Sequence, residues 1–437
     1  MSWFSGSRQP SSSRRCAKSP EPTREHDSIK RPSPVWTRHK SDWSPRRARV
    51  HRDETIANRI DKNLLFRRRP VLKTARLNPY AFFAVMLSPM PESSPDQPPT
   101  FRRIAPALLL VVLAPIVAEF LLADFTVRQL GLLVALMPLY GCGALLIREI
   151  ARRARRGWPT IVLLALAYAL LEEAFLTQSL FNPNYVHQRL LDYGFIPALG
   201  TSFNWTFFVL SIHVVWSVAT PILIAEGIAG PRRTTPWLRR VGLVVTTLFF
   251  LLGCAASVAF SLKSSPFVAS PAQFAVSAAV ILVVIVAAFR AFRPIDESMA
   301  RTTSIAPPLW LVTVATLVLA SAYFAGESVA RAYGLPPAVS VVLRLGCELA
   351  AAVLIVAWSS RQGWTPRHCL AVATGTTATY FLFGLKALMS GHTNLGAPTS
   401  AVDIAGQVAL GAAVLGLILA GARLANADDL GSNLPIR

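Results

Sequence analysis

Long apolar runs recur along the chain from position 104 onward, separated by short polar loops. Each run holds about 18 to 25 residues, the length that a helix needs to cross a hydrocarbon core of about 30 Å. The runs are continuous rather than alternating, so they favour helices over the strands of a closed barrel. Together they predict an all-α fold, a polytopic transmembrane helical bundle. The ten predicted membrane-spanning helices are 104–123, 130–147, 160–180, 203–227, 240–260, 272–290, 308–325, 336–358, 368–388 and 402–422.

Basic residues alternate between the connecting loops. The loops after the second, fourth, sixth and eighth predicted helices carry an excess of Lys and Arg, whereas the loops after the odd-numbered helices carry few. Basic loops tend to stay on the cytoplasmic side of a membrane. The pattern therefore predicts that both termini are cytoplasmic.

The segment before the first apolar run has a different composition. Residues 1–100 are rich in Ser, Pro and Arg and show no sustained apolar period, so we expect a disordered basic tail. A second interpretation is that this segment is an upstream extension and that the natural start lies near Met86 or Met90. The transmembrane helical domain is then expected at 101–425, with a short C-terminal tail at 426–437.

The formal net charge of +21 is unevenly distributed. Residues 1–103 contain 22 of the 44 Lys and Arg residues but only 9 of the 23 Asp and Glu residues. Most of the other basic residues lie in short loops beside apolar runs, where they set membrane orientation. The charge therefore indicates membrane lipids as partners and no nucleic acid. The composition, rich in Ala, Arg, Leu and Val, favours a bacterial plasma membrane.

Common cofactor and catalytic motifs are missing from the sequence. The five cysteines show no C-x-x-C or C-x-x-H pairing, so neither a disulfide framework nor a structural zinc site is expected, and we predict no metal and no cofactor. There is no Gly-rich phosphate loop, nucleophile elbow, H-E-x-x-H or haem-attachment motif. This excludes a kinase, P-loop ATPase, zincin or serine hydrolase of the usual design.

Charged side chains inside the apolar runs are the candidate functional residues, because each costs a few kcal/mol at the bilayer centre. Glu172 and Glu173 lie about twelve residues into the third predicted helix, roughly 18 Å from its cytoplasmic end. His213 lies about ten residues into the fourth, roughly 15 Å from its outer end. The three side chains should therefore meet near the midplane. Arg344 and Glu348 share one face of the eighth helix at a similar depth.

These residues divide into two sets. Glu172, Glu173 and His213 are the candidate catalytic residues, and Gln178, Arg344 and Glu348 are candidates for substrate binding. Charged residues at helix ends are expected to reach the lipid headgroups and to need no special role. These are Glu119, Asp124, Arg148, Glu149 and Glu226.

Paired glutamates in one membrane helix followed by a histidine in the next resemble the CPBP (CAAX-protease and bacteriocin-processing) intramembrane proteases. The resemblance implies that Glu172 or Glu173 activates a water molecule and that His213 shapes the site around the scissile carbonyl. The chain departs from the family pattern at three points. Thr177 replaces the Arg that ends the first motif, Val209 replaces the Phe that precedes the His, and no third His-x-x-x-Asn motif follows.

Two further functions compete with an intramembrane peptidase. A transporter or exporter would line its path with Glu172, His213, Arg344 and Glu348, and it would show broken helices and two related halves. A membrane scaffold would use the same buried ion pairs only to fix the helix register. The peptidase predicts that Glu172, Glu173 and His213 converge within hydrogen-bonding reach, directly or through a water molecule. Its substrate would be a membrane-embedded peptide or small molecule.

Overall fold

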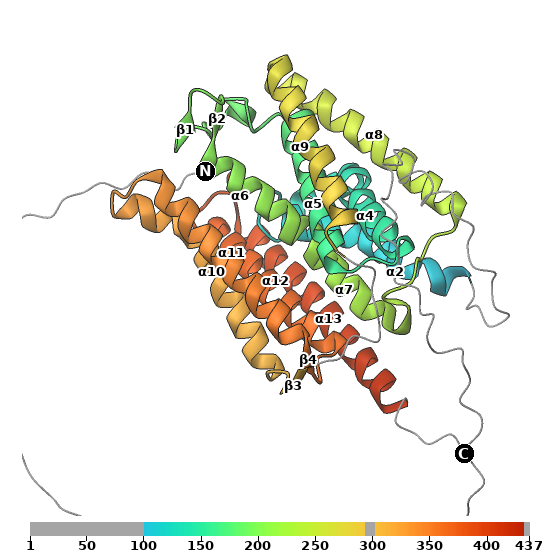
Figure 1. The fold of residues 1–437 in the computed structure, drawn as a ribbon. Helices are drawn as coiled ribbons and strands as arrows, with labels where there is room; N and C mark the ends of the chain where they lie inside the picture. Colours follow the sequence, from blue (N-terminus) through green and yellow to red (C-terminus); the bar gives the residue numbers. More distant parts are fainter. Residues whose placement is uncertain (1–99, 293–301, 432–437) are drawn as a thin grey trace, which may run out of the picture. The chain divides into compact units, whose positions relative to one another are not determined.

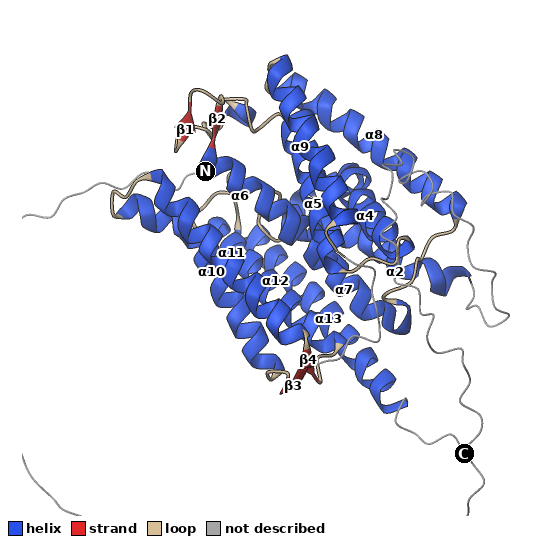
Figure 2. Cartoon of the chain, viewed as in Figure 1, coloured by secondary structure: helices blue, strands red, loops and turns tan. Residues whose placement is uncertain are grey.

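The computed structural model describes residues 100–292 and 302–431. The predicted disordered tail up to residue 99, the choice between Met86 and Met90, and residues 432–437 lie outside the described residues. Within them, each of the ten predicted spans is helical, as Figures 1 and 2 show. The all-α fold class is confirmed.

The first four spans each contain a π-helical segment, in which the helix holds more residues per turn. The first span is α2 (Thr100–Pro115) and η1 (Ile116–Phe120); the second is α3 (Leu132–Leu136), η3 (Met137–Gly141) and α4 (Cys142–Arg153); the third is α5 (Trp158–Leu171) and η4 (Glu172–Leu176); the fourth is α6 (Phe203–Ile212), η6 (His213–Ala219) and α7 (Thr220–Ala229).

The last six spans are single helices: α8 (Arg240–Ser264), α9 (Pro271–Arg290), α10 (Leu309–Ala332), α11 (Pro337–Ser359), α12 (Pro366–Met389) and α13 (Ala401–Gly431). Helix α13 continues nine residues beyond its predicted end at 422 and includes the start of the predicted C-terminal tail. The loops contain 3-10 turns at η2 (Val127–Gln129), η5 (Tyr185–His187) and η7 (Gly230–Arg232). They also contain an antiparallel pair, β1 (Phe195–Ile196) with β2 (Thr201–Ser202), and a parallel pair, β3 (Thr302–Ile305) with β4 (Arg361–Gln362).

Among the described helices, nine are long and apolar enough to cross a membrane. Helix α12 is not one of them, because the threonines in its middle lower its hydropathy. Their hydroxyls satisfy themselves on the helix backbone, as where Thr374 donates to the Leu370 carbonyl at 2.8 Å and Thr379 to the Gly375 carbonyl at 3.1 Å. Helices α7, α10 and α13 pack against α12. It is therefore an interior helix.

Helix α2 and the fourth span contribute to both of the large apolar cores. Trp216 of η6 stacks on Tyr380 of α12 with ring centroids 4.8 Å apart, and its Nε1 donates to the Thr376 carbonyl at 2.8 Å. On the other side, η3 packs closely on α2 at Gly141, where a Cβ atom would lie 2.2 Å from the Val111 carbonyl oxygen. Only glycine allows that approach. The π segments therefore lie in the most tightly packed part of the bundle.

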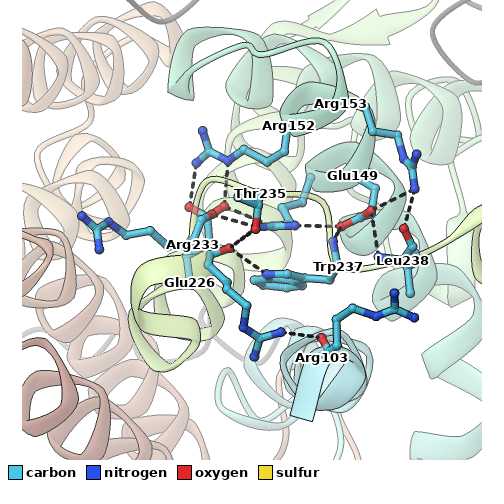
Figure 3. Close-up of polar contacts among 11 residues, drawn as sticks. Arg103, Glu149, Arg152, Arg153, Glu226, Arg233, Thr235, Trp237 and Leu238 are labelled. Carbon is cyan, nitrogen blue, oxygen red and sulfur yellow. Dashed lines mark hydrogen bonds and ion pairs between the residues drawn. The ribbon is translucent and has the colours of Figure 1, made fainter. Parts of the chain in front are cut away.

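A cluster of buried charges joins α4 and α7 to the loop that precedes α8 (Figure 3). We call Arg148, Glu149, Arg152, Glu226 and Trp237 the arginine clamp. Arg152 makes a bidentate pair with Glu226, at 2.8 Å and 2.6 Å. Arg148 donates to Glu149 at 2.7 Å and to Glu226 at 3.1 Å, and its guanidinium lies 3.4 Å from the centre of the Trp237 ring. Every guanidinium nitrogen of Arg148 and Arg152 has an acceptor.

The clamp lies inside the protein rather than at the lipid headgroups. Glu149 is fully buried and accepts hydrogen bonds from the backbone N–H groups of Trp237 and Leu238, at 2.7 Å and 3.2 Å. Arg148 is also fully buried, and Glu226 is 6% exposed. The expectation that these three end residues reach the headgroups is therefore wrong, since the loop before α8 folds over them.

Candidate functional site

The four π-helical segments carry polar side chains that face one another. They bring Glu119 from η1, Tyr140 from η3, the pair Glu172 and Glu173 from η4, and His213 from η6. π-Helical turns inside α-helices occur frequently at functional sites, because the extra residue turns a side chain toward a new direction. Their convergence marks this region, here called the midplane cluster, as the candidate site.

Proline explains three of the four π segments. Pro115 directly precedes η1, Pro138 lies within η3, and Pro221 follows η6 by one residue. A proline inside a helix cannot donate to the carbonyl four residues earlier, and its ring clashes with that carbonyl, so the preceding turn widens. The local sequence therefore sets the irregular turns that present the polar side chains.

The fourth π segment ends differently. The Thr177 N–H donates to the Glu172 carbonyl, five residues earlier, at 2.9 Å. The next residue, Gln178, has a positive φ of 55° and ends the helix. The Gln178 side chain is buried, and its Oε1 accepts from the Ala269 N–H at 2.8 Å. Gln178 thus closes the helix onto the loop before α9, and this contact does not place it among the catalytic candidates.

Glu173 is held on both carboxylate oxygens. Its Oε1 lies 2.7 Å from His213 Nε2, and its Oε2 accepts from Thr177 Oγ1 at 3.1 Å and from Ser179 Oγ. A carboxylate only accepts hydrogen bonds, so His213 carries its proton on Nε2 when Glu173 is ionised. Ser217 Oγ then donates to His213 Nδ1, at 3.2 Å. Glu173 therefore fixes the orientation of the imidazole.

Glu172 has no comparable support. It is 2% exposed, and its Oε2 lies 3.5 Å from His213 Nδ1 but has no hydrogen-bond partner among the described residues. The phenols of Tyr140 and Tyr168 both face this carboxylate. Tyr168 Oη also has no partner of normal hydrogen-bond geometry among the described residues. The cluster thus contains a buried acceptor and a buried donor with unmet hydrogen-bonding capacity.

Glu119, Tyr140 and Tyr168 are site residues that the sequence analysis does not identify. Glu119 hydrogen-bonds to the Tyr140 phenol and adds a third carboxylate beside Glu172 and Glu173. The Tyr140 ring stacks on His213 with centroids 6.0 Å apart, and the Tyr168 ring meets it edge-on at 6.4 Å. The prolines beside η1 and η3 are the sequence signal that could have drawn attention to Glu119 and Tyr140.

Arg344 belongs to a different polar cluster. Its guanidinium donates to Asn204 Oδ1 at 2.8 Å, pairs with Glu327 at 3.2 Å and lies 4.7 Å from the centre of the Phe208 ring. Glu348 of the same helix faces the Ser211 hydroxyl. The contacts of these two residues do not include Glu172, Glu173 or His213. The structure therefore brings together the three catalytic candidates but not the three predicted substrate-binding residues.

A family model matches residues 108–429 of the chain, and its description is "Uncharacterized membrane protein family". The chain belongs to this family. With its nine apolar helices, it is an integral membrane protein. The family model is not that of the CPBP proteases, so that resemblance stays a prediction. No curated protein and no solved structure matches the chain.

The family description assigns no activity, so the chemistry must be argued from the midplane cluster. One ligand atom each from Glu172, Glu173 and His213 lies within 4.8 Å of the other two, a spacing that could hold a metal ion. An imidazole beside an unpaired carboxylate can also bind a water molecule between them. Both possibilities depend on the empty hydrogen-bonding positions around Glu172.

Proposed function

We propose that the protein is a glutamate-dependent intramembrane hydrolase, with Glu172 as the general base. The observation that carries this proposal is the buried Oε2 of Glu172, which has no hydrogen-bond partner among the described residues and lies 3.5 Å from His213 Nδ1. A water molecule hydrogen-bonded to both atoms would be oriented for attack. A base that is not already paired can accept the proton of that water.

The surrounding side chains supply the other roles. Glu173 holds His213 in place through Nε2. The phenols of Tyr140 and Tyr168, which face Glu172, are the donors nearest to a developing oxyanion. Glu172 takes a proton from the water, the hydroxide adds to the substrate carbonyl, and the same proton then passes to the leaving group. The resemblance to the CPBP proteases favours a peptide bond within a membrane-embedded segment as the substrate.

A comparison of membrane proteomes tests this function whichever membrane protein is the substrate. Bacterial membranes containing the wild-type protein are compared with membranes containing Glu172→Gln, and new peptide N-termini are identified by mass spectrometry. We expect new termini near membrane segments with the wild type and their loss with the variant. Glu348→Gln is the matched control, because it removes an intramembrane carboxylate outside the midplane cluster, and it should retain the termini.

The opposite result is equally clear. Identical termini in wild-type and Glu172→Gln membranes, with both proteins present in equal amounts, would refute hydrolysis by this site. A change in stability alone would instead support the scaffold alternative, in which the buried pairs only fix the helix register.

A further inference from the structure

The midplane cluster contains more negative than positive charge. Glu172 and Glu173 are 2% and 4% exposed, and the one basic side chain in contact with them among the described residues is His213, at 6%. Glu119 adds a further carboxylate nearby. Burying an unmatched carboxylate is costly unless a proton or a cation neutralises it. Because Glu173 has hydroxyl and imidazole partners, the need for a counter-charge is greatest at Glu172.

The geometry around Glu172 fits a metal ion. Two ligands bound at about 2.1 Å in a tetrahedral arrangement lie about 3.4 Å apart. The separation between Glu172 Oε2 and His213 Nδ1 is 3.5 Å. Glu173 lies on the other side of the imidazole and accepts the Nε2 proton, which is the usual arrangement of a carboxylate behind a metal-bound histidine. Its carboxylate also comes within 4.8 Å of the other two ligand atoms.

A second, independent side chain points to the same position. Tyr168 is 5% exposed, faces Glu172 and leaves its hydroxyl without a hydrogen-bond partner among the described residues. A buried hydroxyl in this state normally has a water molecule or an ion as its partner. A water molecule bound to a metal ion at Glu172 and His213 would satisfy it.

We propose that Glu172 and His213, supported by Glu173, bind one divalent transition-metal ion per chain. One imidazole and carboxylate oxygens form a donor set that suits Zn²⁺, Mn²⁺ or Fe²⁺ rather than a soft, thiolate-binding ion. The ion would occupy the position assigned above to the bound water and would carry that water itself. The metal site concerns the same side chains as the proposed hydrolase, but it does not depend on hydrolysis.

Metal content of the full chain tests the site directly. The protein is purified through a tag without histidine, in detergent, and its metals are counted by inductively coupled plasma mass spectrometry. We expect about one transition-metal ion per wild-type chain, less than a tenth of that in Glu172→Gln and His213→Ala, and a ten- to hundredfold weaker affinity in Glu173→Gln. Glu348→Gln is the control and should bind like the wild type.

A titration of the metal-free wild-type protein with Co²⁺ keeps the test independent of variant folding. Visible absorption bands that saturate at one equivalent, and that Zn²⁺ abolishes, are expected. A wild-type protein with no bound metal and no Co²⁺ bands would overturn the proposal, as would equal metal content in folded Glu172→Gln. A metal-bound protein that produces no new peptide termini would refute the hydrolase alone, whereas an active protein that never binds metal would refute the metal site alone.

Discussion

The arginine clamp and the midplane cluster are built from similar residues but treat buried charge in opposite ways. In the clamp, Glu226 is held by two arginines, and both guanidinium groups have acceptors for every nitrogen. In the midplane cluster, Glu172 keeps an oxygen without a hydrogen-bond partner among the described residues. The clamp lies at the end of a regular α-helix, whereas the cluster is formed by π-helical turns. The difference separates charge that holds the structure together from charge available for chemistry.

The largest effect is expected when the clamp loses its shared carboxylate. Glu226→Ala leaves Arg148 and Arg152 buried with one fewer carboxylate partner each, and breaking a buried ion pair in this way costs about 3–5 kcal/mol. The apparent melting temperature in detergent should fall by roughly 10 °C. Glu226→Gln, which keeps the shape and some hydrogen bonds, should fall less. A melting temperature equal to that of the wild type would show that the clamp is not a stabilising element.

Glu172→Gln should have the opposite profile. The substitution removes the proposed base, and loss of a general base lowers a rate by about 10²–10⁴-fold. It also removes an unmatched buried charge, so the melting temperature should stay unchanged or rise. Product formation and thermal unfolding are measured on the same preparation. A large fall in melting temperature with Glu172→Gln would place this residue with the clamp, as a structural charge.

Much of this contrast could be predicted from the sequence. The lengths of the apolar runs locate all ten helices, because hydropathy depends on composition alone. Counting residues from the helix ends places Glu172, Glu173 and His213 at one depth, and the structure brings them together. Depth does not determine which face a helix turns to its neighbours. The sequence therefore groups Arg344 with them, although its partners are Asn204 and Glu327.

The remaining features depend on contacts between distant segments. Tyr140 and Tyr168 are ordinary aromatic residues in apolar runs, and they become site residues only because two helices turn them toward Glu172. Arg148 lies at a helix end, where the sequence predicts contact with headgroups, but the residues around Trp237 fold back and cover it. Neither contact has a periodic pattern, so each needs the tertiary structure to be seen.

A smaller effect should follow when one support of Glu173 is removed. Thr177→Val preserves the shape of the side chain but deletes the hydroxyl that donates to Glu173 Oε2 at 3.1 Å. A hydrogen bond of this kind contributes about 1–1.5 kcal/mol, so activity should fall by roughly tenfold. Thr246→Val is the matched control, since that hydroxyl donates at 2.8 Å to the Gly242 carbonyl within its own helix. Equal activity of the two variants would mean that Thr177 does not position the site.

The smallest effect is expected at an ion pair that neither region covers. Arg189 and Asp192 are paired at 2.5 Å, but their side chains are 76% and 52% exposed. Water and salt screen such a pair, and ordering two long side chains offsets most of its attraction. Arg189→Ala should therefore shift the melting temperature by less than about 1 °C at both low and high salt. A fall as large as that of Glu226→Ala would contradict the ranking, because burial would then not decide which charges stabilise this protein.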